Sequence, residues 1–159
     1  ALLAAEIDKS KTPYYFMGSL AYLEEQEGND AVSLEWRRKA YEDAKGPATR
    51  IRWWASYVQA LVRLAPEDSE SILAAAMYVF DEGQGMEDLF SGANYRNLKR
   101  ATESLRTWDE AQNSGQALLA EFEQALAEAC GGQLAGSVEA GNCSSLGPYG
   151  IRPLKRAPA

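Results

Sequence analysis

The stretch GPATRIRWWASYVQALVRLAP, residues 46–66, sets the fold of this chain because it places two tryptophans side by side in a helical pattern. Adjacent residues of an α-helix point about 100° apart around the helix axis. Trp53 and Trp54 must therefore face different surroundings. Either one ring is left in solvent, or the helix buries two faces at once.

The helical wheel of this stretch favours the second alternative. One apolar stripe contains Ile51, Trp54, Val58, Leu61 and Ala65, and the stripe beside it contains Trp53, Tyr57, Ala60 and Leu64. The remaining side carries Arg52, Ser56, Gln59 and Arg63. A helix in the middle of a stacked array packs against its own partner and against the next pair, so it needs such a wide apolar arc. We predict a central helix in which both rings are buried.

Proline and glycine divide the rest of the sequence into blocks of helical length. Thr12 and Pro13 are typical of a helix start, and Gly28 and Gly46 are typical of helix ends. The predicted helical blocks are residues 1–9, 13–28, 30–45, 47–65, 67–82, 93–112 and 115–130. We therefore predict an all-α fold of six to seven helices over residues 1–130. The remaining residues, 131–159, are rich in Gly, Ser and Pro and are predicted to form an irregular tail.

A weak repeat connects two of these blocks. Pro13 and Pro47 lie 34 residues apart, which is the length of a tetratricopeptide (TPR) unit. A shift of 34 residues superposes Met17 on Ile51, Leu20 on Trp54, Ala21 on Ala55 and Ala40 on Ala74. Small residues at such positions let paired helices approach, and large ones fill the space between pairs. The period is lost after residue 82. We predict antiparallel helix pairs stacked as a short, right-handed TPR-like array.

Composition and charge exclude several classes of partner. Apolar residues make up 46% of the chain and charged residues 25%, which is an ordinary globular balance. The net charge of −7 has the wrong sign for binding nucleic acid or an anionic membrane surface. We find no apolar run long enough for a membrane span and no signal-peptide pattern. Because the chain begins at Ala1 in the middle of a helical pattern, we expect a mature product or an excised fragment.

The chain contains no histidine, which removes Ser-His and Cys-His nucleophile pairs and imidazole metal sites. The acidic clusters at residues 24–27 and 67–70 fit a solvated helix face and a first helical turn better than a catalytic pair. The Gly-Gln-Gly run at residues 83–85 lacks the Gly-Lys-Ser/Thr of a phosphate-binding loop. We therefore expect no catalytic, cofactor-binding or metal-binding residues, and no enzyme activity from this chain by itself.

The two tryptophans also permit a functional interpretation. Trp53 and Tyr57 could line a concave groove beside the polar stripe of Arg52, Gln59 and Arg63. A groove with aromatic surface and two guanidinium groups would hold an extended peptide or a carboxylate. Core packing and groove lining both remain open for these aromatic residues.

Cys130 and Cys143 are the two cysteines of the chain, thirteen positions apart, and they form no CxxC motif. Two cysteines without histidine cannot complete a four-ligand zinc site. In an oxidising compartment they would pair and pin the tail to the last helix, a link worth about 3 kcal/mol in the chain-entropy model. In a cytosolic protein they would remain free thiols, and the spacing leaves both alternatives open.

Residues 13–68 resemble the C-terminal helical region of bacterial exported proteins of the thioredoxin-like and disulfide-isomerase-like family. The run KAYEDAKGPATRIRW at residues 39–53, followed by Val58 and the Leu-Ala-Pro of residues 64–66, carries the likeness. A cysteine just after the last helix, with a second about a dozen residues on, is also part of it. The resemblance covers about residues 1–130, and the tail beyond Gly131 departs from it.

The resemblance implies a periplasmic location, a disulfide between Cys130 and Cys143, and an accessory role beside a thioredoxin-like domain of the same parent protein. That domain would carry a CxxC redox pair, which these 159 residues lack, so no catalytic residue is carried over. We expect a non-catalytic interaction domain that recognises client polypeptides. The alternative is a structural spacer or a homodimerisation module that binds no client.

Overall fold

The computed structural model describes residues 2–112 and 118–147, which form helices joined by short connections and contain no strand. The helices of this part of the chain are α1 (Leu2–Ile7), α2 (Pro13–Gln26), α3 (Asp30–Asp43), α4 (Pro47–Leu64), α5 (Ser69–Glu82), α6 (Gly92–Gln112), α7 (Ala120–Gly131) and α8 (Val138–Leu146). The predicted all-α class is confirmed. The number of helices, eight in the described residues, exceeds the predicted six to seven.

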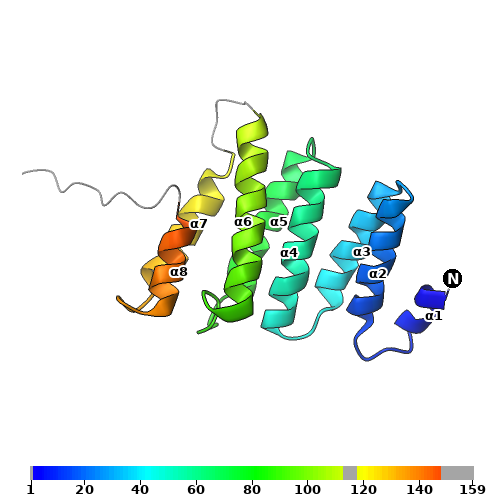
Figure 1. Ribbon diagram of the computed structural model, residues 1–159, viewed down its shortest axis with the longest axis horizontal. Coiled ribbons are helices and arrows are strands. Elements are labelled where there is room, and N and C mark those ends of the chain that lie inside the picture. The colour runs from blue at the N-terminus through cyan, green and yellow to red at the C-terminus, as the bar shows by residue number, and fades with distance from the viewer. Residues whose placement is uncertain (1, 113–117, 148–159) are drawn as a thin grey trace, which may run out of the picture.

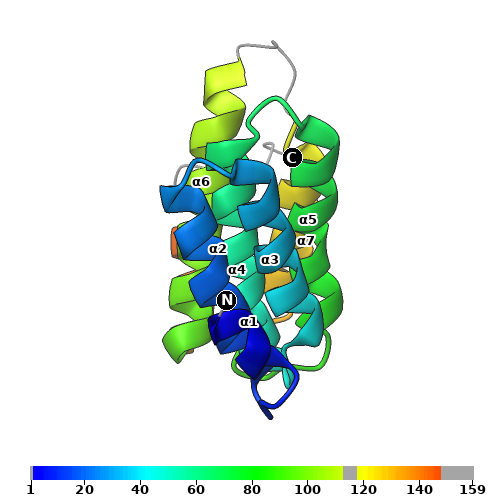
Figure 2. The same ribbon diagram turned by 90° about the vertical axis from the view of Figure 1, so that its right-hand side faces the viewer.

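The helices stand side by side in two layers. Helices α2, α4 and α6 form the layer nearest the viewer in Figure 1, and α3, α5 and α7 lie behind them. The view from the side in Figure 2 separates the same two layers. The short α1 lies against α2 at one end of the array, and α8 lies against α6 and α7 at the other. Each helix runs antiparallel to the next one in the chain.

Helix α4 is the centre of the array, since it contacts α3, α5 and α6. Trp54 has no exposed surface, and its indole Nε1 donates a 2.7 Å hydrogen bond to the carbonyl of Ala75 on α5. Trp53 is turned toward α2, where its ring meets the edges of Tyr14 and Tyr15. Both rings are buried, as the wheel predicts, and each packs against a different neighbour.

A glycine on α2 makes room for the Trp53 ring. A Cβ atom built on Gly18 would lie 2.4 Å from Cη2 and 2.5 Å from Cζ3 of Trp53, far closer than any real contact. The ring therefore lies directly against the backbone of α2.

The predicted 34-residue repeat is wrong for α5, which would be the second helix of the second helix pair. Helices α2 and α4 begin 34 residues apart, but α3 and α5 begin 39 residues apart, because α4 has 18 residues where α2 has 14 and the connection that follows α4 is one residue longer. Ala40 is fully buried, whereas Ala74, its predicted equivalent, is exposed, and Ala75 and Ala76 are buried instead. The right-handed TPR-like geometry stays a prediction.

The predicted irregular tail is also wrong in part, because Val138–Leu146 forms α8. The Ser137 side chain accepts a hydrogen bond from the Ala140 backbone and caps the first turn of this helix. Cys143 and Leu146 are buried in the main core. The helical domain thus continues past residue 130, and residues 148–159 of the predicted tail lie outside the described residues.

The disulfide implied by the resemblance is present. Cys130 of α7 and Cys143 of α8 are bonded, with their Cα atoms 5.5 Å apart. A further hydrogen bond, from the Asn142 side chain to the carbonyl of Phe90, is 2.7 Å long. The disulfide bond fixes α8 covalently to the end of the array.

Candidate binding face on helices α2, α4 and α6

Two open grooves flank α4 on the layer that it forms with α2 and α6. The aromatic groove, between α2 and α4, has a volume of about 630 Å³, and the polar groove, between α4 and α6, has one of about 580 Å³. The aromatic groove is lined chiefly by Tyr15, Gly18, Tyr22, Leu23, Trp53 and Ser56. The polar groove is lined chiefly by Gln59, Val62, Arg63, Arg100, Ser104 and Trp108. We call the surface containing both grooves the α2–α4–α6 face.

The aromatic groove exposes two tyrosine rings above a buried tryptophan. Tyr15 and Tyr22 lie seven residues apart on α2 and are 46% and 58% exposed. The ring centroids of Tyr15 and Trp53 are 5.8 Å apart in an edge-on arrangement. The guanidinium of Arg52 lies 5.5 Å from the centroid of the Tyr15 ring and 5.7 Å from that of Trp53. The groove thus combines accessible aromatic surface with a cation at its edge.

A charged network ties α2, α3 and α4 together beside this groove. Arg63 Nη2 donates to both carboxylate oxygens of Glu25, at 2.6 and 2.8 Å, and Arg37 Nη2 donates to Oε2 at 2.7 Å. Arg37 Nη1 also donates to the Ser56 hydroxyl at 3.0 Å. Burial raises the pKa of Glu25, but the hydrogen bonds from Arg63 and Arg37 outweigh it, and the pKa lies below its ordinary value. Glu25 is therefore a carboxylate whose charge the fold stabilises.

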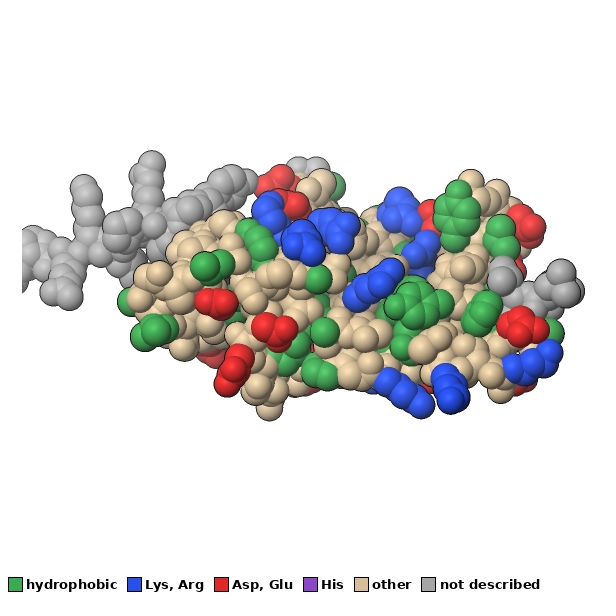
Figure 3. Space-filling view, turned by 60° about the horizontal axis from the view of Figure 1, so that its bottom comes forward, with side chains coloured by type: hydrophobic (Ala, Val, Ile, Leu, Met, Phe, Trp, Pro, Cys, Tyr) green, Lys and Arg blue, Asp and Glu red, His purple; other side chains and the backbone are tan. Residues whose placement is uncertain are grey.

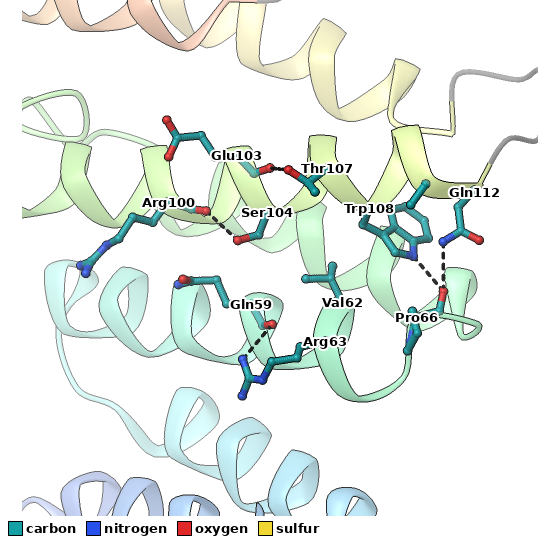
Figure 4. Close-up of a pocket in the computed structure, with 11 residues that line it drawn as sticks. Gln59, Val62, Arg63, Pro66, Arg100, Glu103, Ser104, Thr107, Trp108 and Gln112 are labelled. Atoms are coloured by element: carbon teal, nitrogen blue, oxygen red, sulfur yellow. Dashed lines mark hydrogen bonds between the residues drawn. The ribbon is translucent and has the colours of Figure 1, made fainter.

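The polar groove is closed at one end and open at the other, as Figure 4 shows. At the closed end, Trp108 Nε1 and Gln112 Nε2 both donate to the carbonyl of Pro66, at 2.8 and 3.4 Å. Toward the other end, Arg100 extends from α6 toward α4. Its Nη2 donates to the side-chain oxygen of Asn97 at 2.8 Å. Within the described part of the chain, the Arg100 guanidinium has no carboxylate partner.

The charges on this face differ from those of the whole protein. Helix α4 carries three arginines and no acidic residue, in a chain whose net charge is −7. Two of them are neutralised, Arg50 by Glu82 of α5 and Arg63 by Glu25 of α2, each at 2.6 Å. Figure 3 shows Lys and Arg side chains gathered toward the middle of the molecule, with Asp and Glu side chains mainly toward its two ends. On this side of the molecule, the basic side chains of an acidic protein are thus concentrated toward its centre.

The structure brings four of the five predicted groove residues to this face. Trp53 lines the aromatic groove, Gln59 and Arg63 line the polar groove, and Arg52 lies over the Trp53 ring. Tyr57 lines neither groove.

Tyr57 is buried on another side of α4. Burial raises its pKa, and the ionisable groups acting on its hydroxyl include Arg38 of α3 and Tyr78 of α5, so its ring is turned toward the second layer. Sequence reasoning missed Tyr15, Tyr22 and Arg100, which neighbouring helices contribute. The seven-residue spacing of the two tyrosines was a signal that could have placed them on one helix face.

A third cavity lies between α7 and α8, beside the disulfide, and has a volume of about 400 Å³. Its walls are mainly apolar. Glu123, at its edge, is held by Arg106 at 2.6 Å, and the Ser144 hydroxyl donates to the carbonyl of Ala140. The polar side chains that line it are already engaged, so this slot offers a ligand little beyond apolar contact.

Acidic and cysteine clusters and long apolar helices are two further features to consider in the described residues. Over residues 2–112 and 118–147, no three Cys, Asp or Glu side chains gather in a way that could hold a metal ion. In the same ranges, no helix combines the length and the apolar character needed to cross a bilayer.

Comparison with known proteins gives no assignment. No family model, no curated protein and no solved structure matches this chain.

Proposed function

We propose that this chain is a non-catalytic polypeptide-binding domain whose α2–α4–α6 face receives an extended segment of a client protein. The observation that carries the proposal is the pair of grooves on either side of α4, which join exposed tyrosine rings to arginine side chains on one face. Aromatic rings contribute large contact areas at interfaces, and guanidinium groups bind carboxylates and backbone carbonyls of a peptide. Helical arrays use such extended surfaces for binding.

The proposal includes a cellular setting. The domain would act beside a thioredoxin-like redox domain of its parent protein, in the periplasm, and would recognise that domain's client polypeptides. The likeness of residues 39–53 to exported thioredoxin-like proteins supports this setting. The Cys130–Cys143 disulfide supports it as well, since disulfides persist in oxidising compartments.

Substitution of one arginine tests the binding face. The probe is fluorescently labelled α-lactalbumin, kept unfolded by reduction and carboxyamidomethylation, and its binding is followed by fluorescence anisotropy. We expect Arg52→Glu to weaken binding at least about tenfold, since it reverses a charge beside the aromatic groove. Its melting temperature should stay close to that of the wild type, because Arg52 is exposed.

The matched control is Arg38→Glu, which makes the same charge change on α3 in the other layer. This variant should bind the probe like the wild type. If Arg52→Glu also binds like the wild type, the α2–α4–α6 face is not the client site.

The exposed Tyr22 and Leu23 would also suit the alternative function, a homodimerisation surface. Light scattering on the full chain separates the two. A monomer at micromolar concentration agrees with a face left open for clients. A stable dimer that Tyr22→Glu dissociates would favour the dimerisation module instead.

A further inference from the structure

We infer that the segment recognised by the α2–α4–α6 face is acidic and crosses α4, with an apolar side chain in the aromatic groove and a carboxylate about three residues away at Arg100. This inference deepens the proposed function and depends on it. Three features of the described residues carry it: the nature of each groove, the distribution of charge, and the width of α4.

The aromatic groove favours an apolar side chain. Its exposed walls are the rings of Tyr15 and Tyr22, and its floor is the ring of Trp53. The two serine hydroxyls within it are engaged, since Ser19 donates to the carbonyl of Tyr15 and Ser56 accepts from Arg37. A side chain entering here gains apolar and aromatic contact and few hydrogen bonds.

Arg100 is the arginine of the polar groove that is left to bind a carboxylate, whereas Arg52 lies over the rings of Tyr15 and Trp53 in the aromatic groove. Arg63 is occupied, because both of its Glu25 contacts are short and that carboxylate is further held by Arg37. The guanidinium of Arg100 contacts the amide oxygen of Asn97 and, at 3.4 Å, the carbonyl of Arg96. Glu103, the nearest acid along α6, is paired with Lys99. The planar donor fork of Arg100 is therefore left without a carboxylate, the partner whose geometry it matches.

The charge of the other helices steers an acidic segment to this place. Helices α5 and α7 each contain three acidic residues and no basic one. Helix α4 contains three arginines, two of them ion-paired, and no acidic residue, and α6 contains four basic and three acidic residues. Helix α2 contains two acidic residues, one of which, Glu25, is the partner of Arg63. Exposed charges act over about 10 Å at moderate ionic strength, so local charge rather than the net charge of −7 decides where an anion settles.

The width of one helix fixes the spacing within the ligand. The two grooves lie on opposite sides of α4, and packed helices have axes about 8–10 Å apart. An extended chain advances about 3.3–3.6 Å per residue. A segment that reaches from the aromatic groove to Arg100 therefore spans about three residues.

Short labelled peptides test this spacing and charge. Each carries an N-terminal fluorescein on a Gly-Ser background with one phenylalanine. In the first peptide a glutamate follows three positions after the phenylalanine, in the second it follows directly, and in the third a lysine replaces the glutamate of the first. We expect the first peptide to bind the wild-type chain about tenfold more tightly than the third, with the second several-fold weaker than the first. Added salt should reduce the difference.

Two variants assign the preference to one side chain. Arg100→Gln should bind the first and third peptides equally, while the matched control Arg38→Gln, on α3, should keep the wild-type preference. Both variants should melt like the wild type, because both side chains are exposed.

The results distinguish failure of this inference from failure of the proposed function. If the wild type binds all three peptides equally, or if Arg100→Gln keeps the preference for glutamate, the acidic ligand is wrong and the client face still stands. If neither the peptides nor unfolded α-lactalbumin binds, the proposed function is wrong as well.

Discussion

The indole nitrogens of Trp53 and Trp54 have different surroundings although the residues are neighbours in the chain. The nitrogen of Trp54 donates to the carbonyl of Ala75 on α5 at 2.7 Å. The nitrogen of Trp53 is buried and has no hydrogen-bond partner in the described part of the chain. Burial without a partner costs free energy, so the two tryptophans contribute unequally to stability.

This difference predicts unequal effects of the same substitution. Trp54→Phe removes a buried hydrogen bond together with volume and should lower the free energy of unfolding by about 2–3 kcal/mol. Trp53→Phe removes similar volume and an unpartnered donor, and should cost about 1 kcal/mol or less. Urea denaturation followed by circular dichroism measures both. Equal losses would contradict the different surroundings of the two rings.

Gly18 supplies a second residue-scale prediction. Alanine normally stabilises a helix by up to about 1 kcal/mol relative to glycine. At Gly18 the added methyl would meet the Trp53 ring at 2.4 Å, so we expect Gly18→Ala to destabilise the protein by about 1–3 kcal/mol. Gly141→Ala, in open space on α8, is the control and should be neutral or stabilising. If Gly18→Ala unfolds at the same urea concentration as the wild type, α2 and α4 are not in this close contact.

For the individual helices, the sequence predicts which residues of a helix are buried better than it predicts which other helices they pack against. The wide apolar arc of residues 46–66 predicts that both rings are buried, and α4 is the central helix. The arc cannot say which helix each side meets, so it leaves both core packing and groove lining open for Tyr57, which faces the second layer. The 34-residue shift failed at Ala74 because α4 is four residues longer than α2, and a fixed period cannot show a change in helix length.

The link between α2, α3 and α4 through Glu25 predicts a pH dependence. The pKa of the Glu25 carboxyl is lower in the folded protein than its ordinary value. The charged form therefore stabilises the folded state at pH values above the ordinary pKa of glutamate. This stabilisation is lost as the pH falls through the pKa of Glu25 in the folded protein. Glu25→Gln should therefore be less stable than the wild type at about pH 6, and the gap should close toward about pH 3. Thermal melts across this range measure the gap. A gap that stays constant with pH would contradict the role of the charge.

For the whole molecule, α8 is the part that sequence reasoning did not find. Its nine residues include Gly141 and three consecutive polar or sulfur-bearing residues at 143–145, which are weak helix formers. The helix depends on tertiary contacts instead: the disulfide, the burial of Leu146, and the Asn142 hydrogen bond to Phe90. A local sequence pattern does not show such contacts, whereas proline and glycine mark the ends of α2, α3 and α4 closely. The predicted block 115–130 starts too early, because α7 begins at Ala120, and residues 115–117 lie outside the described residues.

Removal of the disulfide tests how the end of the array is held. Cys130→Ser combined with Cys143→Ser should lower the free energy of unfolding by about 3 kcal/mol, the entropy cost of releasing a short loop. Denaturation of the variant beside the oxidised wild type measures the loss. Hydrogen exchange of α8 amides should quicken more than that of α4 amides. If hydrogen exchange becomes faster by the same factor in α4 and α8, the disulfide does not stabilise α8 more than the rest of the array.

The central claim is that polypeptides bind to the α2–α4–α6 face, and a two-dimensional ¹H–¹⁵N NMR titration tests it most directly. The full, isotope-labelled chain is titrated with the phenylalanine–glutamate peptide of three-residue spacing, and indole signals are followed with the amides. We expect the shifts to concentrate on Tyr15, Tyr22, Arg52, Trp53 and Arg100, with little change on α5 and α7. Shifts confined to α5, α7 or the slot beside the disulfide would contradict it.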